Sequence, residues 1–140
     1  MPRWLRNTLA VVAGIIVGGV VNTVLIGASP SLVPLPAGVD PNDPDSLAKG
    51  IHLFQPRHFV MPFLAHALGT FAGALAAFLL AASHKARLAL AIGVVFLCGG
   101  IAASVMIPAP AWFIALDLLL AYLPMAWLAA RVGGAVQPRA

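Results

Sequence analysis

Polar residues lie inside the apolar segments of the chain, where burial of a polar group costs free energy, and five of them are candidates for a common site. They are Asn22, His66, Thr70, Ser104 and Asp117. A carboxylate and an imidazole together can bind a cation or exchange a proton with a solute, because histidine changes its charge near neutral pH. The amide and hydroxyl groups would supply neutral oxygen ligands. These residue types therefore predict a polar pocket for a small solute or an ion.

The segments that must position these residues have the composition of membrane helices. Of the 140 residues, 61% are hydrophobic and 9% are charged, whereas a soluble domain carries about a quarter charged residues. A helix needs about 20 mostly apolar residues to cross a membrane, and four segments meet this requirement: residues 8–28, 59–82, 88–107 and 112–130. We therefore predict an all-α integral membrane protein in which one domain, residues 1–140, forms a four-transmembrane-helix bundle.

The basic residues predict how the four helices are oriented. Lysine and arginine concentrate on the cytoplasmic side of membrane proteins, and here they mark one end of the helices: Arg3, Arg6, Lys85, Arg87, Arg131 and Arg139. We therefore expect both termini in the cytoplasm, residues 29–58 in an outer loop, and a bacterial inner membrane as the location. The scatter of these residues in ones and twos argues against a nucleic-acid partner. The first apolar segment is longer than that of a signal peptide, so we expect it to remain on the protein.

The outer loop, residues 29–58, contains a short amphipathic helix according to its sequence. In the stretch DPDSLAKGIHLFQP, Asp43 is placed to cap the helix and Pro44 to occupy its first position. Leu47, Ile51 and Phe54 would share one face of this helix. We expect it to lie on the outer membrane surface or to cap the bundle.

Three of the predicted helices bring their most polar residue to a common depth. At about 1.5 Å of rise per residue, Asn22, His66 and Asp117 lie within about 3 Å of one depth below the outer surface. Ser104 lies slightly closer to that surface. A charge at the centre of a membrane helix costs about 2.5–3.5 kcal/mol, so we expect Asp117 to face inward and to meet His66.

Small residues predict the packing face of each helix, because they let two backbones approach closely. These faces contain Gly14 and Gly18 on the first helix, Gly69, Gly73 and Ala77 on the second, Gly93 and Gly100 on the third, and Asp117, Ala121, Pro124 and Leu128 on the fourth. Pro124 cannot donate a hydrogen bond to the carbonyl of Leu120. We therefore predict a kink just below Asp117, with Pro124 as a hinge.

Two stretches of the sequence are alike. GGVVNTVLIGASP begins at Gly18 and GGIAASVMIPAPA begins at Gly99, and they match without gaps at Gly, Gly, Val, Ile and Ala. A duplication would give two pseudo-repeated helical hairpins related by an axis along the membrane normal. Gly- and Ala-rich segments also match by chance, so an unrelated pair of hairpins stays an alternative.

Metal binding and catalysis could use some of the same residues. His52, His58 and His66 are candidate metal ligands, although no two of them have the i, i+4 spacing of a helical metal site. Ser104, His66 and Asp117 are the residue types of an acyl-transfer triad, but the chain lacks a G-x-S-x-G motif. We therefore expect no enzyme and no cofactor.

The sequence leaves two functions open. The first is transport of a small solute or an ion, with or without proton coupling, through the pocket near the outer face. The second is a non-catalytic accessory or structural role in a larger membrane complex, in which the buried polar residues only hold the helices together. In both cases the bilayer surrounds the chain, and we expect a second copy or another membrane protein as its partner.

Overall fold

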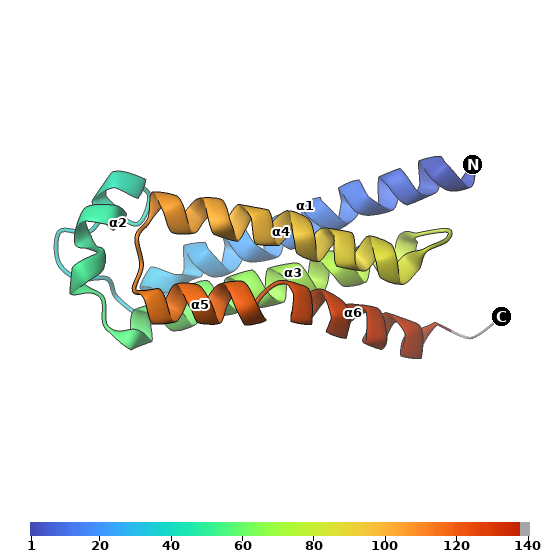
Figure 1. Ribbon diagram of the computed structural model, residues 1–140. Coiled ribbons are helices and arrows are strands. Elements are labelled where there is room, and N and C mark those ends of the chain that lie inside the picture. The colour runs from blue at the N-terminus through green and yellow to red at the C-terminus, as the bar shows by residue number, and fades with distance from the viewer. Residues whose placement is uncertain (138–140) are drawn as a thin grey trace.

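The computed structural model describes residues 1–137, and within that range the chain forms helices and contains no strand. The long helices are α1 (Arg3–Leu32), α3 (Val60–Leu80), α4 (Lys85–Met106) and the consecutive pair α5 (Ala111–Leu120) and α6 (Leu123–Val136). They lie side by side, with the start of α1 and the end of α6 at one end of the bundle and α2 at the other (Figure 1). We call these the terminal end and the loop end.

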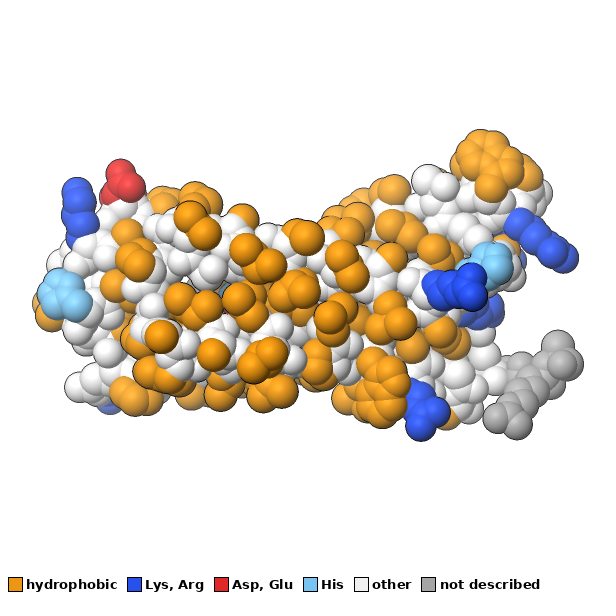
Figure 2. All heavy atoms as spheres, viewed as in Figure 1, with side chains coloured by type: hydrophobic (Ala, Val, Ile, Leu, Met, Phe, Trp, Pro, Cys, Tyr) orange, Lys and Arg blue, Asp and Glu red, His pale blue; other side chains and the backbone are white. Residues whose placement is uncertain are grey.

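The surface supports a multi-pass membrane protein. Over the described residues, four helical segments are long and apolar enough to cross a membrane. Figure 2 shows an apolar band over the middle of one face, with the charged side chains gathered at the two ends. Such a band is what hydrocarbon tails require, because they cannot hydrate a charged group. Arg139, one of the basic residues used above, lies outside the described residues.

The most extensive contact in the bundle joins α1 and α3, and glycines on both helices make it possible. A Cβ atom added to Gly18 would lie 2.7 Å from the carbonyl oxygen of Gly69, and one added to Gly73 would lie 2.5 Å from that of Gly14. Real Cβ atoms do not approach backbone oxygens so closely, so only glycine fits. The packing faces predicted for these two helices are confirmed at these four residues.

The first helix is longer than predicted. It begins at Arg3 and ends at Leu32, whereas the sequence predicts residues 8–28. Pro30 lies inside its last turn, where a proline removes a single hydrogen bond, that to the carbonyl of Ile26. The loss of one bond near a helix end is small, and the helix therefore continues past the proline.

The last predicted helix is divided in two. Tyr122 has φ −116° and ψ −81°, outside the helical region, and α6 starts at the next residue with Pro124 in its first turn. The interruption expected from Pro124 is therefore present. A proline in the first turn needs no hydrogen-bond donor of its own, which explains why a new helix begins there.

This break changes which residues of the last segment face the core. Asp117 and Ala121 are buried as predicted, but Pro124 and Leu128 are exposed. The predicted packing face is therefore wrong beyond Ala121. Because Tyr122 is not helical, the helical period starts again after it, and the buried positions become Ala126, Ala129 and Gly133.

The loop helix caps the bundle. α2 spans Pro44–Gly50, and the side chain of Asp43 accepts a hydrogen bond of 3.0 Å from the backbone N–H of Asp45, as a capping residue does. After Gly50 the chain tightens into the short 3₁₀ helices η1 (Ile51–Leu53) and η2 (Pro56–Phe59). The helix is thus shorter than predicted, but its position over the loop end agrees with the capping role (Figure 1).

Hydrogen bonds close the terminal end. The side-chain oxygen of Asn7 accepts from the backbone N–H groups of Ala82 (2.9 Å) and Ser83 (3.2 Å), and its NH₂ group donates to the Ser83 hydroxyl (3.0 Å). Nε of Arg6 donates to the carbonyl of Leu80 over 2.8 Å. The start of α1 is therefore held to the turn between α3 and α4.

The hairpin repeat stays a prediction. α4 ends at Met106, ahead of Pro108, whereas the corresponding part of α1 continues through Pro30 to Leu32. The two stretches that are alike in sequence thus end differently.

Replacing Gly18 with alanine should lower the free energy of unfolding by about 1–3 kcal/mol, because the new Cβ overpacks the contact with α3. The neighbouring change Gly19→Ala is the matched control, since a Cβ there meets no atom within 4 Å. Unfolding of both variants in detergent micelles would be compared with that of the wild type. Equal stability of the two variants would contradict the glycine contact.

Candidate functional site

The centre of the candidate site is a histidine and an aspartate from different helices. Nδ1 of His66, on α3, lies 2.9 Å from Oδ1 and 3.0 Å from Oδ2 of Asp117, on α5. Asp117 is only 4% exposed. The two residues that the sequence places at one depth are therefore brought into direct contact, and the carboxylate faces the bundle.

Tyr122 completes the site, and the sequence analysis does not predict it. Its hydroxyl donates a hydrogen bond of 2.9 Å to Oδ2 of Asp117, and its ring stacks on His66 with 5.8 Å between the ring centroids. The ring has room because Gly100 of α4 lies beside the hydroxyl, where a Cβ would collide with it. The available signal was a phenol in an apolar segment, five residues after the one acid outside the loop.

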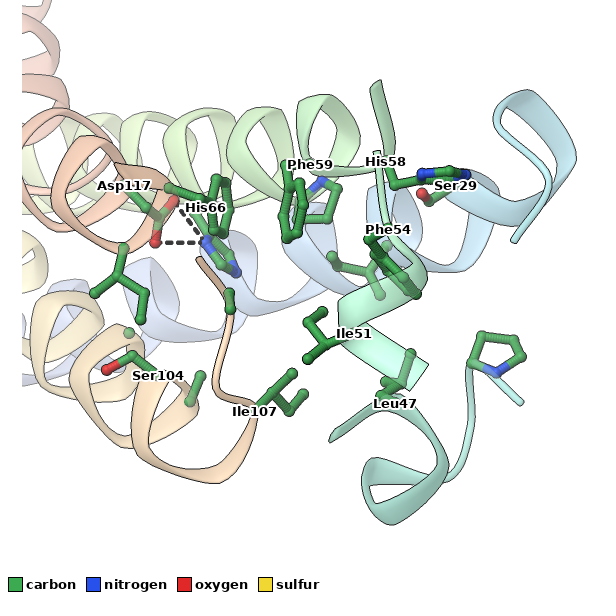
Figure 3. Close-up of a pocket in the computed structure, with 18 of the residues that line it drawn as sticks. Ser29, Leu47, Ile51, Phe54, His58, Phe59, His66, Ser104, Ile107 and Asp117 are labelled. Carbon is green, nitrogen blue, oxygen red and sulfur yellow. Dashed lines mark hydrogen bonds and ion pairs between the residues drawn. The ribbon is translucent and has the colours of Figure 1, made fainter. Parts of the chain in front are cut away.

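When Asp117 is ionised, these contacts decide which nitrogen of a neutral His66 is free. An ionised carboxylate only accepts hydrogen bonds, so with Asp117 ionised, Nδ1 of His66 carries a proton and donates it. The neutral ring then has a lone pair on Nε2. Figure 3 shows this second nitrogen pointing away from Asp117 into a cavity that His66 lines. A carboxylate on one ring nitrogen orients the other for binding a ligand or a proton.

The cavity lies between the loop helix and the His66–Asp117 pair, and we call it the chamber. Its volume is about 220 Å³. The polar residues among its lining are Ser29, His58, His66, Ser104 and Asp117, and the other lining residues are apolar. The chamber is thus more apolar than the sequence analysis expects, with its ionisable pair at the deep end.

Apolar and aromatic side chains form the rest of the wall. Leu47, Ile51 and Phe54, the three residues predicted to share a face of the loop helix, all line the chamber (Figure 3). Phe54 lies 5.8 Å from Phe59, measured between ring centroids, and Phe59 lies 4.7 Å from Phe113. The loop therefore supplies a lid whose inner surface is continuous with the bundle.

His58 holds the lid in place. The backbone N–H of Gln55 donates to Nδ1 of His58 over 2.8 Å, and Nε2 of His58 lies 3.1 Å from the carbonyl oxygen of Pro34, to which it donates as N–H. Both nitrogens of this buried ring are therefore occupied. The bond to Pro34 connects the segment that follows α1 to η2, which leads into α3.

The three candidate metal ligands do not form one site, although His58 and His66 both line the chamber. His52 is exposed and lines a different, shallow hollow of the loop, and both ring nitrogens of His58 are hydrogen-bonded as described. Among residues 1–137, no group of three or more His, Cys, Asp or Glu side chains is placed to hold a metal ion.

The remaining candidate residues lie in different places. Ser104 lines the chamber, but its hydroxyl donates to the carbonyl of Ile101 over 2.7 Å. Asn22 packs against Gly69 at the α1–α3 contact, and Thr70 is fully buried on α3. Neither Asn22 nor Thr70 is among the residues lining the chamber, and in the described part of the chain Oδ1 of Asn22 and Oγ1 of Thr70 have no hydrogen-bond partner.

Packed side chains fill the bundle on the terminal side of the site. Tyr122 and the small residues Ala67 and Ala121 form a cluster with Phe96 and other partly buried hydrophobic side chains. A second apolar cluster around Ile92 and Phe78 continues toward the terminal end. The chamber is therefore confined to the loop end.

Comparison with protein-family models, with curated proteins and with solved structures found no match to this chain.

Tyr122→Phe should lower the free energy of unfolding by about 1.5–3 kcal/mol, the contribution of a hydrogen bond to a charged group. In an Asp117→Asn background the same change should cost less, because the acceptor is then neutral. Unfolding of the two single variants, the double variant and the wild type in micelles measures this coupling. The same loss in both backgrounds would show that the hydroxyl does not depend on the charge of Asp117.

Proposed function

We propose that this protein moves a small solute or an ion across a membrane in exchange for protons. The observation that carries the proposal is the His66–Asp117 pair at the deep end of the chamber, with Nε2 of His66 unpaired within residues 1–137 (Figure 3). An imidazole that is oriented through one nitrogen and free at the other is suited to take up and release a proton.

The charge of the site favours exchange of a proton for another cation. With His66 neutral and Asp117 ionised, the pair carries one net negative charge, and no lysine or arginine is among the described residues that line the chamber. An uncompensated charge in apolar surroundings costs several kcal/mol. A proton on His66 or a bound cation would each remove this cost, so the arrival of one favours the departure of the other.

Few titratable or charged groups face His66. Asp117 and Tyr122 contact its ring directly, and His58, in another part of the chamber wall, uses both ring nitrogens in hydrogen bonds. The polar groups that α1 and α4 contribute to the wall are Ser29 and Ser104, which are neutral. Proton exchange in the chamber is therefore assigned to His66, with Asp117 as its counter-charge.

Passage through the protein requires the terminal end to open. The moving part we propose is α6, because the break at Tyr122 separates it from α5 and Pro124 leaves the carbonyl of Leu120 without its helical partner. Opening would also separate the hydrogen bonds of Asn7 with the turn at Ala82 and Ser83. In the orientation predicted from the basic residues, the chamber faces the outer side and this network faces the cytoplasm.

The test is proton flux in liposomes that contain the purified protein, driven in turn by gradients of Na⁺, K⁺ and 2-phenylethylammonium, because an exchanger moves protons only against a second cation. His66→Asn should lower proton flux by an order of magnitude or more, because the Asn NH₂ group can still donate to Asp117 while Nε2 is lost. His84→Asn is the matched control, since His84 is exposed in the turn at the terminal end, and it should leave the flux unchanged. Flux would be followed with a pH-sensitive dye inside the liposomes.

Equal proton flux in the wild type and in folded His66→Asn would overturn the proposal, and so would a wild type that carries no flux above that of empty liposomes. Circular dichroism and the unfolding midpoint of each variant establish that a loss of flux is not a loss of fold.

A second candidate function is that of an accessory subunit. On α1, a Cβ added to Gly19 or Gly27 meets no atom within 4 Å, and Thr23 between them is exposed. Small residues spaced by four on an open face accommodate another membrane helix. Absence of flux in the wild type, together with a membrane-protein partner that is lost on Gly19→Leu, would favour this role over transport.

A further inference from the structure

We propose that the ligand of the chamber is a small organic ammonium ion with a compact apolar body, whose head binds Nε2 of His66. The inference rests on the proposed function for its biological meaning, but the binding itself does not depend on transport. It follows from the charge, the wall, the size and the free nitrogen of the chamber.

The head of the ligand is identified by the deep end of the chamber. Asp117 supplies a negative charge there, and Nε2 of neutral His66 supplies a hydrogen-bond acceptor in contact with the cavity (Figure 3). An ammonium group satisfies both, because it is positive and has only N–H donors. An anion would meet the buried carboxylate with no basic lining residue to compensate, within the part of the chain described.

A bare inorganic cation does not fit this site. Hard cations such as Ca²⁺ take six to eight oxygen ligands, whereas both oxygens of Asp117 already accept from His66 and Tyr122. The hydroxyl of Ser104 is directed to the carbonyl of Ile101. The chamber therefore offers a negative charge but few free oxygen ligands for a bare ion. This favours an organic cation, whose charged nitrogen already carries covalent substituents.

The body of the ligand is identified by the wall. Phe54, Phe59 and Phe113 line the chamber and contact one another in series. Aromatic faces attract organic cations and bury the carbon atoms attached to them. Ile51 and Leu47 of the lid add aliphatic surface on the same side (Figure 3). A strongly polar solute that kept its bound water would make no favourable contact with these apolar side chains.

The size of the chamber limits the ligand further. Its volume of about 220 Å³ is below the 300–1,000 Å³ of pockets that hold drug-sized molecules. A primary amine with one aromatic ring or a short branched chain is therefore the appropriate class.

The state of His66 decides whether the ammonium head can bind. A second proton on the ring sits on Nε2, which then becomes a donor and carries positive charge. It repels an ammonium ion and removes its acceptor. Proton and ligand thus compete for the same atom, as the exchange proposed above requires.

The test is equilibrium binding of 2-phenylethylammonium to the wild-type protein in lipid nanodiscs, measured by calorimetry with empty nanodiscs subtracted. The neutral analogue 2-phenylethanol has the same body and can still donate to Nε2, so it isolates the charge. We expect the ammonium ion to bind at least tenfold more tightly than the alcohol. Asp117→Asn should remove this preference, and His84→Asn should preserve it.

Two further variants keep the test informative if Asp117→Asn does not fold. Phe54→Leu changes the lid alone and should weaken ammonium binding severalfold through loss of an aromatic face, and His66→Asn should weaken it while retaining the partner of Asp117. Equal affinity for the ammonium ion and the alcohol would overturn the proposal, as would no binding of the ammonium ion or undiminished binding in folded His66→Asn.

The outcomes for ligand and function are separable. Ammonium binding with no proton flux would leave the ligand class standing and remove the transport function. Proton flux that depends on His66, with no ammonium binding, would do the opposite.

Discussion

A carboxylate buried among apolar helices must be satisfied within the protein, and the arrangement around Asp117 follows from that constraint. His66 and Tyr122 direct their hydrogen bonds to its two oxygens, and each comes from a different part of the bundle. An unsatisfied charge at this position would cost several kcal/mol. The pair that meets this requirement also leaves one imidazole nitrogen free toward the chamber, so the structural need and the proposed chemistry share the same three side chains.

Close approach of the helices shapes the space around this pair. Glycines on α1 and α3 bring these two backbones into contact, and Gly100 of α4 leaves the space that the ring of Tyr122 occupies. Such contacts depend on shape, because helices in lipid gain little from the hydrophobic effect. The loop then closes the space that remains between the helices at one end, and His58 holds that loop through bonds at both ring nitrogens. The chamber thus exists because small residues leave space between the helices at the loop end, and because the loop covers that space as a lid.

Much of the fold could be predicted from the sequence, and less of the site. Long segments with almost no charge predict membrane-spanning helices, and four helices long and apolar enough to cross a membrane are present in residues 1–137. The spacing of His66 and Asp117 from their helix ends predicts a common depth. Depth did not decide contact for Asn22, which lies outside the chamber, because depth says nothing about rotation around the helix axis. The predicted register of the last segment was wrong beyond Ala121, since the extent of unwinding ahead of Pro124 depends on what packs against it.

The sequence by itself determined the composition of the bundle: four long apolar helices, a capped loop helix, and one acid in an apolar segment that required a polar partner inside the bundle. These features are local, because they follow from hydropathy, capping residues and the free energy of burying a charge. Only the tertiary structure decided that Tyr122 joins Asp117, that Nε2 of His66 faces a cavity, and that this cavity is lined by phenylalanines. Those outcomes depend on how helices distant in sequence rotate and pack against one another, which no periodicity within a single segment encodes.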